Sequence, residues 1–161
     1  MTYTYCPHCG NKLTQKEIGD EGLVPFCLTC QKPFFSFSHP CVLCIVINEN
    51  NKIALIKQSY VSQNYVGVAG YIKQGETIEE CACREVEEET GLEVISAKYL
   101  NNYYYEKRDL LMIGVVCRVK NGDFNISKEV EDAKWFIPEE AVTALTPGSV
   151  IQTMVKEFMQ L

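Results

Sequence analysis

The stretch REVEEETGL contains four glutamates, and three of them have a spacing that could bind a metal ion. Glu85, Glu88 and Glu89 stand at positions i, i+3 and i+4, which places their carboxylates on one face of a helix, whereas Glu87 projects elsewhere. Clustered carboxylates repel one another and destabilise an isolated helix, and a divalent cation reverses that cost. Oxygen ligands of this kind suit Mg²⁺ or Mn²⁺. The pattern therefore predicts a metal site suited to phosphate chemistry, and the competing interpretation is a solvated helix face.

The residues around these glutamates predict where the helix begins and ends. Thr77 followed by Glu80 is a capping box, so we expect a helix from Ile78 to about Thr90. Gly91 is well placed to end it. Arg84 adjoins the carboxylates and is always charged, so it could hold one of them in place.

Two CxxC pairs near the start, in CPHCG and CLTC, predict a second kind of metal site. The pairs are separated by 17 residues, which lies within the range expected for a four-thiolate zinc site. The predicted zinc ligands are Cys6, Cys9, Cys27 and Cys30. Four thiolates complete a tetrahedron, so the zinc would be structural rather than catalytic. The alternatives are two unrelated pairs or a redox dithiol.

The remaining cysteines have positions typical of packed, unliganded side chains. Residues three apart in a strand face opposite sides, and residues two apart in a helix also diverge, so neither pattern chelates one ion. We interpret five cysteines in this way: Cys41, Cys44, Cys81, Cys83 and Cys117.

Composition limits the class of protein. The chain has 161 residues and a net charge of −6, which gives no general attraction to nucleic acid or anionic lipid. The sequence has no apolar run of about 18 residues, which excludes a predicted membrane span. The first residues lack the layout of a signal peptide, so we expect a cytoplasmic protein.

Element patterns predict a small appendage followed by a mixed α/β (α+β) domain. We expect a zinc ribbon with its connector at 1–38 and the main domain at 39–161. Residues 41–48 and 52–58 flank the turn-rich NENN and predict a hairpin. Further strands are predicted in LEVISAKYLNNYYY, DLLMIGVVCRVK and KEVEDAKWF, and further helices in PEEAVTAL and SVIQTMVKEFMQ.

The segment from Gly70 to Leu92 resembles the Nudix box, G-x₅-E-x₇-R-E-U-x-E-E-x-G-U, at every fixed position. This resemblance implies an α/β/α sandwich with a mixed sheet. It also implies a Mg²⁺- or Mn²⁺-dependent hydrolase that acts on a nucleoside diphosphate linked to another group. The box would be the metal-binding loop, helix and loop of that fold.

The resemblance also implies roles for individual residues. Glu85 and Glu89 would be the principal metal ligands, and Glu88 would add a ligand or help to activate the attacking water. Arg84 would orient the carboxylates through salt bridges. The Gly70 carbonyl would reach a metal ion.

A four-cysteine ribbon before the box resembles the NADH pyrophosphatase branch of the family. Members of that branch cleave NAD(H) into a nicotinamide mononucleotide and AMP, and some remove NAD caps from RNA. The stretch EVEDAKWF is similar to the branch's strand with a further metal-binding glutamate, which Glu129 matches best and Glu131 next best.

The chain departs from this branch about ten residues after the box. The branch signature is close to S-Q-P-W-P-F-P-x-S, and the corresponding stretch here is NNYYYEKRDLLM. The tyrosines of this stretch, Tyr103 and Tyr105 among them, could stack on a base, because aromatic faces bind bases without exact hydrogen bonds. The alternative is that they fill a core or cover the sheet.

The sequence thus predicts a Nudix hydrolase that cleaves a pyrophosphate linkage, with NADH, NAD⁺, a related dinucleotide or ADP-ribose as substrate. One alternative is a pyrophosphatase acting on noncanonical nucleoside triphosphates. The other is a zinc-ribbon regulatory module that binds nucleotides without cleaving them. A nucleic-acid partner is not expected, apart from a capped RNA end. Formation of a homodimer is a further possibility.

Overall fold

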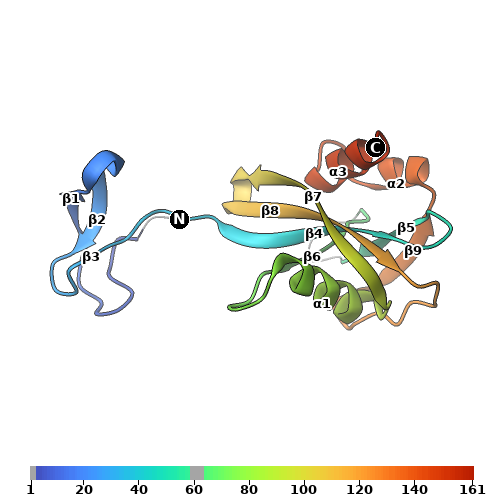
Figure 1. Ribbon diagram of the computed structural model, residues 1–161, viewed down its shortest axis with the longest axis horizontal. Coiled ribbons are helices and arrows are strands. Elements are labelled where there is room, and N and C mark those ends of the chain that lie inside the picture. The colour runs from blue at the N-terminus through green and yellow to red at the C-terminus, as the bar shows by residue number, and fades with distance from the viewer. Residues whose placement is uncertain (1–2, 59–63) are drawn as a thin grey trace. The chain divides into compact units, whose positions relative to one another are not determined.

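The computed structural model describes residues 3–58 and 64–161, which divide into two compact units, Met1–Ser38 and His39–Leu161. The first unit contains a three-stranded antiparallel sheet and one 3-10 turn (blue in Figure 1). Its elements in chain order are β1 (Thr14–Glu17), η1 (Gly19–Glu21), β2 (Leu23–Cys27) and β3 (Lys32–Pro33).

The second unit is built on a six-stranded mixed sheet. Five strands follow the order β7-β8-β4-β5-β9, and β6 pairs with β4. The β4–β8 pair is parallel, and the other pairs are antiparallel. The strands are β4 (His39–Ile47), β5 (Ile53–Lys57), β6 (Val68–Tyr71), β7 (Val94–Tyr105), β8 (Leu110–Val119) and β9 (Asp132–Phe136). The helical segments are α1 (Ile78–Thr90), η2 (Glu106–Arg108), α2 (Pro138–Ala144) and α3 (Val150–Phe158).

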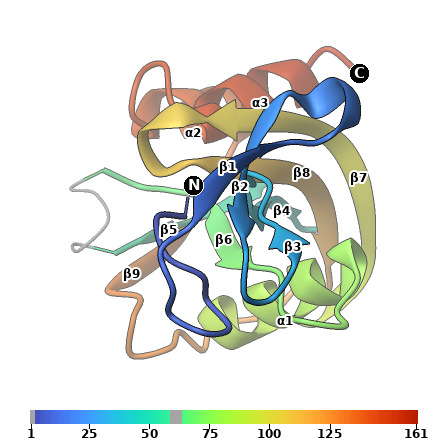
Figure 2. The same cartoon turned by 90° about the vertical axis from the view of Figure 1, so that its left-hand side faces the viewer.

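Helices cover both faces of this sheet, which confirms the predicted α/β/α sandwich (Figures 1 and 2). The central strand β4 shows why, because its side chains alternate between two apolar cores. The side chains that pack toward α1 include Val42, Cys44 and Val46. Those that pack toward α2 and α3 include Leu43, Ile45 and Ile47. A strand buried on both faces needs a helical layer on each side.

Helix α1 has the predicted bounds, and both of its ends are capped. Thr77 and Glu80 form the capping box. Gly91 adopts φ of 70° and donates its N–H to the Glu87 carbonyl. The inner face buries Cys81, Ala82 and Val86. With that face fixed against the sheet, Glu87 and Glu88 are exposed on the helix, whereas Glu89 is buried.

The predicted hairpin of β4 and β5 is confirmed, whereas the strand expected in KEVEDAKWF begins late. Residues 127–130 form a turn in which the Val130 N–H donates to the Ser127 carbonyl at 3.2 Å. Val130 is buried in the core beneath α1, and this draws the chain off the sheet until Asp132. In the described ranges, no helix has the length and apolar character needed to span a membrane.

Candidate active site on helix α1

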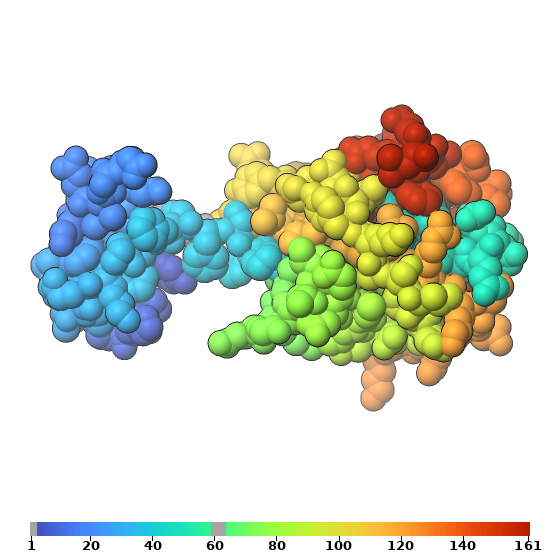
Figure 3. All heavy atoms as spheres, in the orientation of Figure 1, coloured from blue at the N-terminus to red at the C-terminus, as the bar shows by residue number. Residues whose placement is uncertain are grey.

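Four glutamates line one open pocket of about 350 Å³. Helix α1 contributes three of them, and the turn before β9 contributes the fourth together with a lysine and a serine. The lining residues are Glu85, Glu88, Glu89, Ser127, Lys128 and Glu129. Glu131, the sequence competitor of Glu129, is outside this lining set. Part of α1 and the loop before it reach the surface in the space-filling view (green in Figure 3).

Glu89 is the buried member of the group, with a side chain only 8% exposed. The Gln58 Nε2 donates a hydrogen bond to the Glu89 Oε1 at 2.9 Å. Among the described residues, no group forms a hydrogen bond with the Glu89 Oε2. Burial raises the pKa of Glu89 to about 7, the Gln58 hydrogen bond lowers it, and the charge of Glu85 raises it further. A buried carboxylate oxygen without a partner is costly, so this atom calls for a cation.

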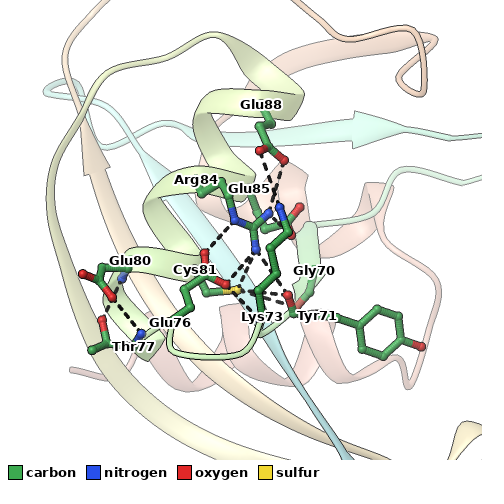
Figure 4. Close-up of polar contacts among 10 residues, drawn as sticks. All are labelled: Gly70, Tyr71, Lys73, Glu76, Thr77, Glu80, Cys81, Arg84, Glu85 and Glu88. Carbon is green, nitrogen blue, oxygen red and sulfur yellow. Dashed lines mark hydrogen bonds and ion pairs between the residues drawn. The ribbon is translucent and has the colours of Figure 1, made fainter.

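Arg84 holds the loop and two carboxylates of the helix in one network (Figure 4). Its Nε and Nη2 donate to the two oxygens of Glu76 at 2.6 and 2.9 Å. Its Nη1 donates to Glu85 at 2.5 Å and to Glu88 at 3.2 Å. The bidentate bond from Arg84 lowers the pKa of Glu76 to about 2. Arg84 therefore keeps Glu76 ionised and holds the side chains of Glu85 and Glu88 beside it.

Gly70 lets β6 pass close to the same carboxylates. A Cβ at this position would lie 1.9 Å from the Glu85 Cδ, which no side chain could tolerate without displacing Glu85. The Gly70 carbonyl oxygen lies 4.0 Å from the Cys81 Sγ. Glycine is thus required here for space rather than for an unusual backbone angle.

Comparison with known proteins assigns this arrangement to a family. The NUDIX domain family matches residues 37–154, a span that includes the whole pocket. The chain belongs to the Nudix family. The match covers most of the second unit, and the predicted Nudix box extends from the end of β6 through the loop and α1 to just past its cap.

The chain is similar to proteins named as hydrolases of NAD-capped RNA. It is 25% identical to "NAD-capped RNA hydrolase NudC" of Vibrio vulnificus over 99% of this chain and 60% of that protein. It is 32% identical to "NAD-capped RNA hydrolase NUDT12" of Homo sapiens, over 91% of this chain and 33% of that one. The chain therefore spans at most about 60% of the length of these relatives.

A plant relative and a solved structure extend the comparison. The chain is 36% identical to "Nudix hydrolase 19, chloroplastic" of Arabidopsis thaliana, over 88% of this chain and 34% of that one. A crystal structure of a NUDIX hydrolase from Nitrosomonas europaea aligns with a TM-score of 0.76 and 21% identity. The alignment covers 98% of this chain and 91% of that one, and it shows a shared fold.

The two tyrosines singled out in the sequence lie on β7, outside the set that lines the Nudix pocket. Tyr103 is half-buried against the core beneath α3, and its hydroxyl donates to the Glu157 carboxylate. Burial, followed by the Glu157 contact, raises the pKa of Tyr103. Tyr105 is also half-buried. Contact of either residue with a base stays a prediction.

The four N-terminal cysteines come together in the first unit. Their Sγ atoms all lie within 4.8 Å of one another. Two pairs across the site are in contact, Cys9–Cys27 at 3.5 Å and Cys6–Cys30 at 3.8 Å. The hydrogen bond with the Cys9 thiol, followed by burial, raises the pKa of Cys30 to about 12. Four sulfurs gathered this closely can bind one dication together, and four soft ligands suit zinc.

Sequence reasoning missed three residues of the Nudix site: Gln58, Ser127 and Lys128. Gln58 is polar, yet it follows directly on a buried apolar strand, and that is a signal that could have drawn attention to it. Ser127 and Lys128 precede Glu129 in a polar stretch that resembles an ordinary loop. Only the fold brings them beside α1.

Proposed function

We propose that this protein hydrolyses the pyrophosphate linkage of a nucleoside diphosphate derivative with the aid of Mg²⁺ or Mn²⁺. The observation that carries the proposal is the convergence of four carboxylates on one pocket, with the buried Glu89 Oε2 unpartnered among the described residues. Membership of the Nudix family supports the same chemistry.

The residues of the pocket fit a divalent metal ion. The donors are carboxylate oxygens, which Mg²⁺ and Mn²⁺ prefer, and an orphaned buried oxygen lies among them. The residues that would hold metal are Glu85, Glu88, Glu89 and Glu129, with the carbonyl of Gly70. Metal bound there supplies charge neutralisation for the diphosphate and lowers the pKa of water.

Three side chains of the pocket region have further roles in the proposed reaction. Arg84 orients Glu85 and Glu88 through its hydrogen bonds, and it is itself held by the bidentate bond to Glu76. The Glu88 side chain is 55% exposed at the pocket, so it is placed to accept a proton from a water that attacks phosphorus. Lys128 brings a positive charge to the same pocket, where a phosphate oxygen would lie.

We propose NADH, NAD⁺, a related dinucleotide or ADP-ribose as the substrate. The names of the Vibrio vulnificus and human relatives support a dinucleotide, and an RNA end capped with NAD has the same diphosphate linkage. The four-cysteine ribbon before the Nudix domain supports the same branch, with a structural Zn²⁺. None of the nine cysteines is paired in a disulfide, which supports a reducing compartment such as the cytoplasm.

A hydrolysis screen with product masses tests this proposal. Zinc-loaded protein would be incubated with Mg²⁺ or Mn²⁺ and with NADH, NAD⁺, ADP-ribose, FAD, dinucleoside polyphosphates and nucleoside triphosphates. We expect two nucleoside monophosphates from NADH or NAD⁺, or the corresponding pair from a related diphosphate.

The products separate the competing functions. A monophosphate plus inorganic pyrophosphate, from a nucleoside triphosphate alone, would replace the proposal with a triphosphate pyrophosphatase. Binding of nucleotides without turnover, by folded and metal-loaded protein, would replace it with a regulatory module.

A further inference from the structure

Gln58 is a buried polar residue that links the end of β5 to the Nudix helix. Its side chain is 6% exposed, and its Nε2 donates to the Glu89 Oε1 at 2.9 Å. Glu89 itself is 8% exposed and leaves its Oε2 without a hydrogen bond among the described residues. We propose that Gln58 is a positioning residue that orients Glu89 so that the Oε2 faces the pocket and binds the divalent cation. This inference rests on the proposed function.

The chemistry of an amide suits this task. Arg84 donates to Glu76, Glu85 and Glu88, and so it orients those carboxylates through charge. A neutral amide N–H fixes the rotamer of Glu89 while leaving its full negative charge for the cation. A lysine or arginine at position 58 would neutralise Glu89 and compete with the metal.

The backbone around Gln58 is held firmly enough to position another side chain. Ile56 exchanges two backbone hydrogen bonds with Val66, at 3.0 and 2.8 Å. Lys57 accepts the backbone N–H of Glu131 at 2.8 Å, which fixes the segment that carries Glu129 to the same strand end. Gln58 therefore lies where β5, α1 and the fourth glutamate are joined. Groups that orient metal ligands need such rigid support.

The test compares Gln58→Met with the matched control Gln152→Met. Methionine keeps the length of glutamine but removes the amide. Gln152 lies on α3, on the opposite face of the sheet, and is 8% exposed. Its side chain donates to the Val142 carbonyl and accepts from the Gly148 N–H. Both variants lose buried hydrogen bonds, so both are destabilised, but only Gln58 contacts Glu89.

The primary readout is the dissociation constant of Mn²⁺, measured by electron paramagnetic resonance on zinc-loaded protein without substrate. Loss of a group that orients a metal ligand typically costs about 10- to 100-fold in metal affinity or activity. We expect a weakening of this size for Gln58→Met, a fall in kcat with little change in KM at saturating metal, and wild-type Mn²⁺ affinity for Gln152→Met.

Wild-type Mn²⁺ affinity in Gln58→Met would overturn the inference, and so would an equal loss in both variants. If Gln58→Met does not fold, Gln58→Asn moves the donor back by one methylene and is judged by the same criteria. If wild-type protein binds Mn²⁺ but hydrolyses nothing, only the proposed function is overturned. The Mn²⁺ affinities of Gln58→Met and Gln152→Met still decide the role of Gln58. Wild-type protein without Mn²⁺ affinity would defeat both.

Discussion

Glu89 shows how one residue can set the protein's response to pH. Its side chain is buried beside Glu85, and burial raises its pKa from 4.5 to about 7. The folded protein therefore holds a proton on Glu89 in a pH range where the unfolded chain has released it. Without a cation to compensate its charge, ionisation of Glu89 therefore lowers the stability of the fold.

The first prediction concerns stability without added Mg²⁺. Because the folded state binds more protons between pH 4.5 and about 7, the free energy of unfolding should fall as the pH rises through this window. The decline from Glu89 is at most about 3 kcal/mol. Urea unfolding of wild-type protein and Glu89→Gln at pH 5 and pH 8 measures it, and the variant should lose most of the decline.

Glu76 affects the free energy of unfolding in a separate pH range and in the opposite direction. Arg84 lowers its pKa to about 2, so its contribution to stability is present above pH 4.5 and is lost as the pH falls toward 2. The two windows do not overlap. Equal declines between pH 5 and pH 8 in wild-type protein and Glu89→Gln would therefore contradict the assignment to Glu89.

The individual residues of the box could be predicted from the sequence, whereas their partners could not. Fixed spacing on a helix determined that Glu85, Glu88 and Glu89 share a face, and all three line the pocket. The bond from Gln58 to Glu89 joins residues 31 positions apart, and it exists only because β5 ends beside α1. Helical spacing carries no information about such a contact.

At the scale of elements, the site depends on how closely β6 approaches α1. The two meet at Gly70, whose missing side chain makes room for Glu85. Arg84 adds to this junction by donating from α1 to the Tyr71 carbonyl at 3.2 Å (Figure 4). A change at the junction should alter the proposed metal site before it alters the fold.

The second prediction is that Gly70→Ala reduces kcat by about 100-fold or more. The added Cβ forces Glu85 from its position. Misplacing a group of the active site by about 1 Å can reduce the rate about 100-fold. Gly122→Ala is the matched control, since its Cβ would lie 3.8 Å from its nearest neighbour, an ordinary contact. Turnover and circular dichroism measure the effects. Near-wild-type turnover in folded Gly70→Ala would refute the role given to this junction.

The periodicity of the chain predicted most elements but not their pairing. Helix α1 was predicted with its bounds because the capping box and Gly91 mark both ends. The parallel pairing of β4 with β8 joins strands about 70 positions apart, and the apolar runs of both would fit several sheet orders. The late start of β9 follows from the burial of Val130, which depends on the core beneath α1.

At the scale of the whole molecule, the chain combines two units with different sources of stability. The second unit, His39–Leu161, has two apolar cores, one on each face of its sheet. The first unit, Met1–Ser38, is small, and its strands β1 and β3 expose most of their side chains. A unit of about 40 residues usually needs a metal or disulfides to fold, and its four clustered thiols suit a metal.

The third prediction is that Cys27→Ser removes about one zinc ion per chain and unfolds the first unit, because three sulfurs and a poorer ligand no longer hold the ion. Plasma mass spectrometry measures the zinc, and proteolysis of residues 3–38 reports unfolding. Cys83→Ser is the matched control, since Cys83 is a half-buried thiol on α1. Full zinc content in Cys27→Ser would exclude the four-thiolate site.

The central claim is that the carboxylates of α1 carry out metal-dependent hydrolysis. The most direct test is to measure kcat for three charge-matched variants on the best substrate of the screen. Glu88→Gln and Glu89→Gln remove one carboxylate from the pocket, whereas Glu87→Gln removes one from the same helix on an exposed face outside it. With Mg²⁺ saturating and the folds intact, we expect the first two to lose at least about 100-fold in kcat, the lower end of a general acid–base contribution. Glu87→Gln should stay within about twofold of wild type. Wild-type turnover in Glu88→Gln or Glu89→Gln, or an equal loss in all three, would contradict the account.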